Sequence, residues 1–257
     1  KRRYFDAMQR HVWAWKEGRV KSIKKYVDKM ITILPFETEF YKKHSYEVDY
    51  VGNPLMDEIG DYRNSAETLI SPKPVLALLP GSRKQELDNM LPVMAETAKM
   101  FKDEFSIHIA CTPNFDLSYY KNLVGDLEAT YLVDQTYNIL NSAKLAMVTS
   151  GTATLEAGIF NVPQVVCYKG NKITIWIARK LVKLNYISLV NLIMDKMVVE
   201  ELIQEEFTVD NVAKALQRFQ TAEGEAEIAL NYSILNKKLG GSGASVRAAE
   251  VIVNDIS

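Results

Sequence analysis

The feature that most constrains this chain is a regular alternation of short apolar runs and helical patterns between residues 75 and 168. Apolar runs bounded by turn residues predict buried strands, and the segments between them carry apolar residues at helical spacing. Strands are expected at residues 75–79, 106–110, 130–132, 145–149 and 164–168, and helices at 84–101, 116–125, 136–142 and 152–160. Such alternation is typical of a doubly wound α/β domain with a parallel sheet.

Two of the predicted strand-to-helix loops carry the residues of an anion site. The first follows the strand at 145–149 and continues as Ser-Gly-Thr-Ala-Thr over residues 150–154. Free N–H groups and the positive end of the helix dipole would face a bound phosphate, and Gly151 lets the backbone approach it closely. Glu156 follows about one turn later, where its carboxylate could accept hydrogen bonds from a ribose. An ordinary helix cap explains this motif equally well when it is taken alone.

The second loop is Pro-Gly-Ser-Arg at residues 80–83, directly after the strand at 75–79. A guanidinium at this position, Arg83, suits bidentate contact with a diphosphate. An arginine at a helix start is commonly just solvated. Two such loops in one parallel sheet nevertheless favour a site for a nucleoside diphosphate at the carboxyl ends of the strands.

Composition excludes several classes of protein. Hydrophobic residues make up 47% of the 257 residues and charged residues 25%, as in an ordinary soluble domain, and a net charge of −1 gives no general attraction to nucleic acid. Cys111 and Cys167 each end an apolar run, which predicts buried, reduced thiols. No apolar run is long enough to span a membrane and no signal peptide is present, so we expect a chain that is neither spanning nor exported. The first residue is not Met, which suggests that the sequence begins inside a longer protein.

Motifs of other chemistries are missing from the sequence. The three histidines show no ligand spacing, so no metal site is expected. There is no Gly-x-Ser-x-Gly elbow, and the loop at Gly81 lacks the Gly-Lys-Ser/Thr of a P-loop, which argues against a serine hydrolase and an ATPase.

The N-terminal region predicts part of a second domain. Residues 1–30 are locally basic, which fits either a surface for an acidic ligand or membrane headgroups, or a solvated helix face at 19–29. A strand at 30–34, a helix at 36–44 and a strand at 47–51 follow. We place the domain seam at Gly-Asn-Pro, residues 52–54, and interpret the residues from there to 74 as polar and irregular.

Beyond residue 170 the pattern changes. Residues 171–186 lack acidic side chains and place basic and apolar residues at helical spacing. This predicts a basic amphipathic helix, which could lie in a membrane interface or pack on its own domain. A short loop is expected at 188–192, an acidic helix around 200–205, a helix at 210–220 and, after a glycine-rich break at 240–243, a last helix at 244–255.

Several short motifs occur in a specific order and spacing. They are Val-Trp-Ala-Trp at 12–15, Leu-Pro-Phe-Glu at 34–37, Tyr-Val-Gly-Asn-Pro at 50–54, Leu-Pro-Gly-Ser-Arg at 79–83, Ser-Gly-Thr-Ala-Thr-Leu-Glu at 150–156, the helix at 176–183, Ser-Leu-Val-Asn-Leu at 188–192 and Glu-Leu-Ile-Gln at 201–204. In these motifs the chain resembles the lipid-A-disaccharide synthases, which are inverting glycosyltransferases of the GT-B type with two Rossmann-like, doubly wound domains. The resemblance implies that residues 1–53 end the N-terminal, acceptor-side domain. Residues 54–257 would form the C-terminal UDP-sugar-binding domain, with the last helices crossing back.

The resemblance also implies an activity. 2,3-Diacylglucosamine would move from UDP-diacylglucosamine to diacylglucosamine 1-phosphate, giving lipid A disaccharide 1-phosphate and UDP, with no metal or cofactor. Arg83 would neutralise the leaving group and Glu156 would hold the ribose. The remaining donor-site residues implied are Gly81, Ser82, Ser150, Gly151, Thr152, Ala153, Thr154, Asn191, Glu201 and Gln204. The general base is expected in a further N-terminal part that full members of the family possess, and we assign none here.

Both implied substrates carry acyl chains, which favours the interfacial interpretation of the helix at 171–186. The enzyme would be cytoplasmic and bound peripherally to the inner membrane of a Gram-negative cell. The expected membrane contacts are Trp176, Arg179, Lys180 and Lys183. The glycine-rich break at 240–243 would also permit a homodimer. Two other hypotheses remain open: another GT-B UDP-sugar transferase or epimerase, and a non-catalytic UDP-binding module.

Overall fold

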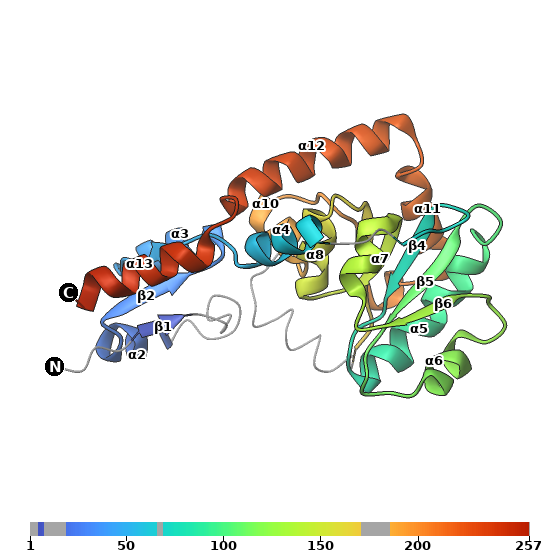
Figure 1. The fold of residues 1–257 in the computed structure, drawn as a ribbon, viewed down its shortest axis with the longest axis horizontal. Helices are drawn as coiled ribbons and strands as arrows, with labels where there is room; N and C mark the ends of the chain where they lie inside the picture. The colour runs from blue at the N-terminus through green and yellow to red at the C-terminus, as the bar shows by residue number, and fades with distance from the viewer. Residues whose placement is uncertain (1–4, 8–18, 66–68, 171–185, 257) are drawn as a thin grey trace.

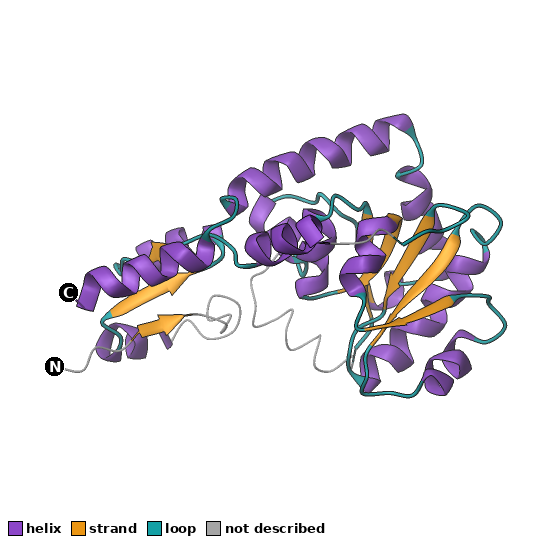
Figure 2. Ribbon diagram, viewed as in Figure 1, coloured by secondary structure: helices purple, strands orange, loops and turns teal. Residues whose placement is uncertain are grey.

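The computed structural model describes residues 5–7, 19–65, 69–170 and 186–256, which form two parallel sheets. In Figure 2 the two sheets lie at opposite ends of the molecule, with helices around and between them. The expected α/β class with parallel sheets is confirmed, because every strand pair in both sheets is parallel.

The smaller sheet has the strand order β1-β2-β3. Its elements are β1 (Phe5–Ala7), α2 (Arg19–Tyr26), β2 (Lys29–Thr32), α3 (Pro35–Lys43) and β3 (Asp49–Tyr50). Val20 and Ile23 of α2 pack with Met30 and Tyr41 in a small buried cluster. Val20 and Ile23 therefore turn inward, as their helical spacing predicts, and the lysines of α2 face solvent.

The larger sheet has the order β6-β5-β4-β7-β8-β9. Its strands are β4 (Val75–Leu79), β5 (Ser106–Cys111), β6 (Thr130–Val133), β7 (Ala143–Thr149), β8 (Gln164–Tyr168) and β9 (Glu201–Ile203). The chain proceeds outward from β4 to β6 and then returns to the other side of β4 with β7. Because Leu79 at the end of β4 pairs with Val148 of β7, the two loops that follow these strands begin side by side. The strand order reverses at this position, as in doubly wound folds.

Helices cover the larger sheet and connect its strands (Figure 1). They are α5 (Lys84–Lys99), α6 (Leu117–Val124), α7 (Thr136–Ser142), α8 (Thr152–Ile159), α10 (Leu189–Met194), α11 (Val209–Arg218) and α12 (Ala222–Leu239). Every residue of β4 is at most 4% exposed, which explains why this strand is a continuous apolar run rather than an alternating one. On α5, Leu87, Leu91, Met94 and Ala98 are all buried and recur every three or four residues, so one stripe of the helix faces the core.

The chain crosses between the two sheets twice, and the two crossings contact each other. The first, at residues 52–54, leads into α4 (Leu55–Ser65); the second, at 240–243, leads from α12 into α13 (Ala244–Ile256). The carbonyl of Leu239 accepts hydrogen bonds from the Tyr50 hydroxyl (3.0 Å) and the Asn53 N–H (3.4 Å). In Figure 1, α12 starts on the side of the larger sheet and α13 lies with the smaller one.

Charged side chains hold α13 against the first crossing. Arg247 Nε donates to the carbonyl of Val51 at 2.7 Å, and the Asp57 carboxylate accepts from the N–H groups of Gly243 and Ser245. Partial burial alone would raise the pKa of Asp57. The bonds from Ser245 and Gly243 outweigh that effect, so the pKa lies below its usual range and the carboxylate stays charged at neutral pH.

Three of the expectations for local structure were wrong. The segment after residue 54 is not irregular, since it begins with helix α4. Asn53 Oδ1 accepts the N–H of Leu55 at 3.0 Å, so Asn-Pro is a helix start here rather than a turn. The expected loop at 188–192 is the start of α10. The expected acidic helix around 200–205 is strand β9, which pairs with β8, followed by a 3-10 turn at Gln204–Glu206.

Both cysteines are free and buried, as expected, and burial raises the pKa of the Cys111 thiol to about 11. Within the described ranges, no helix combines the length and the apolar character needed to cross a membrane. The predicted membrane contacts at 176, 179, 180 and 183 lie outside the described residues.

Candidate functional site

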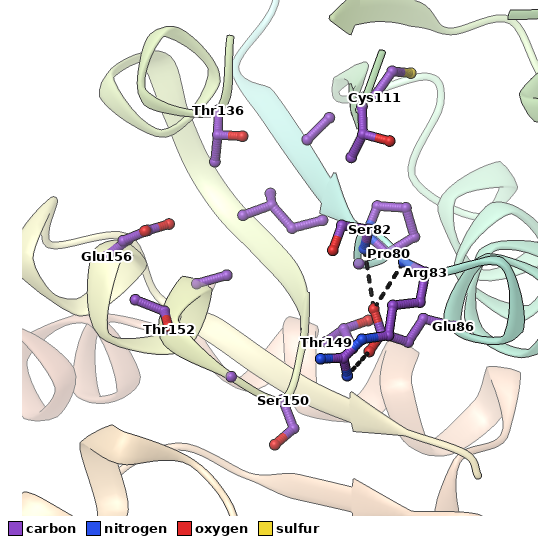
Figure 3. Close-up of a pocket in the computed structure, with 16 residues that line it drawn as sticks. Pro80, Ser82, Arg83, Glu86, Cys111, Thr136, Thr149, Ser150, Thr152 and Glu156 are labelled. Carbon is purple, nitrogen blue, oxygen red and sulfur yellow. Dashed lines mark hydrogen bonds and ion pairs between the residues drawn. The ribbon is translucent and has the colours of Figure 1, made fainter. Parts of the chain in front are cut away.

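A pocket of about 480 Å³ opens at the carboxyl ends of β4 and β7, where the strand order of the larger sheet reverses (Figure 3). Both predicted anion loops line it, together with residues at the end of β5 and the start of α7. The predicted site residues in its lining are Gly81, Ser82, Arg83, Ser150, Gly151, Thr152, Ala153 and Glu156. The structure therefore brings together residues that are up to 75 positions apart, from Gly81 to Glu156.

The loop after β4 is closed by a carboxylate from its own helix. Glu86 Oε2 accepts from the N–H groups of Ser82 (3.0 Å) and Arg83 (3.2 Å), and Glu86 Oε1 pairs with Arg83 Nη1 at 3.1 Å. Gly81 has φ of +99°, and a Cβ at that position would overlap the Glu86 carboxylate, so only glycine fits. Our sequence interpretation missed Glu86, although its spacing of three residues from Arg83 is that of a capping box.

The loop after β7 is more open. Gly151 is exposed with φ of +144°, and α8 begins at Thr152. Ser150 Oγ donates to the carbonyl of Ile187 at 3.3 Å, and Thr154 Oγ1 donates to the carbonyl of Gly151 at 2.8 Å. Thr154 is thus buried as part of the helix start and does not line the pocket. The N–H groups of the first turn of a helix have no acceptor within the helix, so this end of α8 can bind an anion.

Two further residues add polar atoms to the pocket. Thr149, at the end of β7, lines it with a buried hydroxyl that has no hydrogen-bond partner among the described residues, and our sequence interpretation did not assign it to the site. Glu156 lies on the opposite side of the pocket from Arg83 (Figure 3). Burial, and secondarily the charge of Glu58 on α4, raises the pKa of Glu156 to about 7.

Asn191 and Glu201 lie outside this pocket, in a hydrogen-bonded network of their own. The Glu201 carboxylate accepts from Ile187 N (2.8 Å), from Ser188 N and Oγ (2.9 and 2.7 Å), and from Asn191 Nδ2 (2.8 Å). Asn191 Oδ1 accepts from the N–H groups of Val198 and Val199 at 2.7 and 3.0 Å. This network fixes the start of α10, which Ser188 caps, and it includes Ile187, whose carbonyl accepts from Ser150.

Gln204 also lies outside the pocket. It is 7% exposed, and its side-chain Nε2 donates to the carbonyl of Gly170 at 3.0 Å. In the part of the chain that the structure describes, no group of three or more His, Cys, Asp or Glu side chains is arranged to hold a metal ion.

Comparison with known proteins identifies the family. The family model for lipid-A-disaccharide synthetase matches residues 8–252. The chain belongs to the lipid-A-disaccharide synthase family. It is 34% identical over 253 residues to the lipid-A-disaccharide synthase of Myxococcus xanthus, and 34% identical over 273 residues to that of a Sulfurihydrogenibium species. These alignments cover 94% and 97% of this chain but 66% and 70% of the relatives, so the chain spans about two thirds of their length.

Solved structures show the same fold at low sequence identity. UDP-GlcNAc 2-epimerase from Neisseria meningitidis, bound to UDP-GlcNAc, matches with a TM-score of 0.60 and 12% identity, covering 96% of this chain and 67% of the epimerase. The calicheamicin glycosyltransferase CalG4 matches with a TM-score of 0.56 and 15% identity, covering 95% of this chain and 60% of CalG4. The GT-B fold expected for this family is thereby confirmed.

The Glu201 network makes a testable prediction about stability. In Glu201→Ala, four donor bonds lose their acceptor around the start of α10, so we expect the free energy of unfolding to fall by about 2–4 kcal/mol. Urea denaturation measures this change. Glu206→Ala, at an exposed position of the adjacent 3-10 turn, is the control and should change stability by about 0.5 kcal/mol or less. Similar losses in both variants would contradict a stabilising role for the network.

Proposed function

We propose that this chain is the donor-binding part of a lipid-A-disaccharide synthase. The reaction is transfer of 2,3-diacylglucosamine from its UDP conjugate to 2,3-diacylglucosamine 1-phosphate, with release of UDP. One observation carries the proposal. In a chain of this family, the pocket at the carboxyl ends of β4 and β7 has an arginine on one side and a helix N-terminus on the other. An epimerase of the same fold binds UDP-GlcNAc, and a UDP-sugar is the donor proposed here.

The pocket supplies what a departing diphosphate requires. When the bond between the sugar carbon and the phosphate oxygen breaks, negative charge accumulates on the diphosphate. The Arg83 guanidinium and the N-terminal end of α8 both stabilise negative charge at that place. Glu156 lies on the far side of the pocket, and we assign it to the ribose because a carboxylate can accept hydrogen bonds from ribose hydroxyls. The acceptor hydroxyl must also lose its proton, and we assign no general base for this step.

Arg83 provides the first test. In Arg83→Ala, loss of a charge-assisted contact with the diphosphate should weaken UDP binding about ten- to a hundredfold. Calorimetric titration of UDP measures this change. Lys84→Ala is a matched control, because it removes a neighbouring positive charge that pairs with Asp88 and does not line the pocket. Equal affinities of the wild type and Arg83→Ala would contradict the assignment.

The reaction itself is tested with the full-length protein and the acylated substrates. We expect disaccharide and UDP in equal amounts, and a much lower rate in Arg83→Ala. Release of free sugar or of an epimer would instead indicate another UDP-sugar enzyme of this fold. Binding of UDP without turnover would indicate a non-catalytic module.

The raised pKa of Glu156 predicts a pH dependence. The charged carboxylate accepts hydrogen bonds from ribose hydroxyls better than the protonated form, so UDP affinity should rise as pH increases through about 7. UDP also titrates in this range, and the affinity profile of Glu156→Gln shows the contribution of UDP alone. The difference between the wild-type profile and the Glu156→Gln profile should therefore show the titration of Glu156. Glu58→Gln should move the Glu156 titration to lower pH, because this substitution removes the neighbouring negative charge. Superimposable profiles for the wild type and Glu156→Gln would rule out this role.

We also propose that residues 171–186 hold the protein on the membrane that contains its acylated substrates. The segment combines Trp176 with basic residues and no acidic ones, a composition typical of interfacial helices. Replacing Trp176 and Lys180 by Glu should reduce sedimentation with anionic phospholipid vesicles several-fold. Lys214→Glu, at an exposed position of α11, is the control for added negative charge. Unchanged vesicle binding of the double variant would refute a membrane-binding role for residues 171–186.

A further inference from the structure

Glu86 of α5 has no part in the function proposed above, yet its carboxylate accepts three hydrogen bonds from the loop that carries Arg83. Its carboxylate accepts from two backbone N–H groups, those of Ser82 and Arg83, and from the Arg83 guanidinium (Figure 3). The first two donors are N–H groups just before α5, where a strand-to-helix loop could otherwise bind a phosphate. In the structure an internal carboxylate already occupies them.

The burial of the two partners is unequal. The Glu86 side chain is 20% exposed, whereas the Arg83 side chain is 83% exposed. The carboxylate is therefore enclosed by the loop, and the guanidinium extends from it toward solvent at the pocket. Gly81 makes this arrangement possible, because any side chain at residue 81 would overlap the Glu86 carboxylate.

We propose that Glu86 is a positioning residue for Arg83, an inference that rests on the proposed binding of a UDP-sugar. Its carboxylate holds the loop at 80–83 in one conformation and limits the directions in which the Arg83 side chain can extend. Because the carboxylate already accepts from the N–H groups of Ser82 and Arg83, these groups do not bind the diphosphate. The diphosphate is bound by the guanidinium and by the N-terminus of α8. In this role Glu86 acts on the ligand through Arg83.

This arrangement predicts the sign of a mutational effect. A positioning carboxylate strengthens ligand binding, whereas a carboxylate that competes with phosphate for the loop N–H groups weakens it. In Glu86→Ala we therefore expect UDP affinity to fall about five- to twentyfold. Glu86→Gln keeps an oxygen that can accept from Ser82 and Arg83 but loses the charge that attracts the guanidinium. Its UDP affinity should therefore fall by about two- to fivefold.

A double-mutant cycle separates positioning from a general effect on the fold. If Glu86 acts through Arg83, Glu86→Ala should change UDP affinity by less than about twofold when Arg83 is already Ala. Glu96→Ala, on the same helix and paired with Lys99, is the matched control and should bind UDP like the wild type. Tighter binding in Glu86→Ala, or an equal loss with and without Arg83, would overturn the proposal.

A second measurement does not depend on the ligand. Hydrogen exchange of the Ser82 and Arg83 N–H groups should be faster in Glu86→Ala than in the wild type, and close to the wild type in Glu86→Gln. If the wild-type protein fails to bind UDP, the proposed function is wrong, and this exchange still tests whether Glu86 orders the loop. Unchanged exchange in Glu86→Ala would refute the positioning role even if UDP binds.

Discussion

The parallel pairing of β4 with β7 is the constraint on which the candidate site depends. These strands are separated by two other strands and three helices in the sequence, yet Leu79 and Val148 are direct neighbours in the sheet. Parallel strands point their carboxyl ends to the same edge, so the loops that follow them open into one pocket. The pairing is maintained by burial, because both strands are covered on their two faces by helices.

The two loops at this edge have different electrostatic characters. The loop after β4 carries its own carboxylate, Glu86, which satisfies two backbone donors and pairs with Arg83. The loop after β7 has no such internal anion among the described residues, and an open glycine precedes its helix. Under the proposed function, the diphosphate would be held by α8 and by the guanidinium rather than by the N–H groups of residues 82 and 83. The proposed division of roles depends on a single acidic side chain placed three residues after Arg83.

Buried polar networks fix the surroundings of the pocket. Glu201 and Asn191 came from the sequence as candidates for contact with the donor sugar, a role that stays a prediction. In the structure the Glu201 side chain accepts from the N–H groups of Ile187 and Ser188, and the Asn191 side chain accepts from those of Val198 and Val199. Ser150 of the pocket contacts Ile187. Substitutions at either residue can thus change the pocket indirectly, by altering the segment that Ser150 contacts. A loss of activity alone would not distinguish support from ligand contact.

The sequence by itself determined the alternating elements between residues 75 and 168, because helix and strand periodicity is a local property of the chain. The limits of β4, β8 and α7 agree with the expected ones to the residue. Tertiary structure decided the rest. Glu201 lies in a strand because β9 pairs with β8, and Asn53 is held at the start of α4 partly because its Nδ2 donates to the distant carbonyl of Ile33; both contacts form only on folding. The spacing of Glu86 from Arg83 is a signal that the sequence contains. That its carboxylate lies against the loop follows only from the left-handed turn at Gly81. Backbone angles of this kind are not specified by residue types alone.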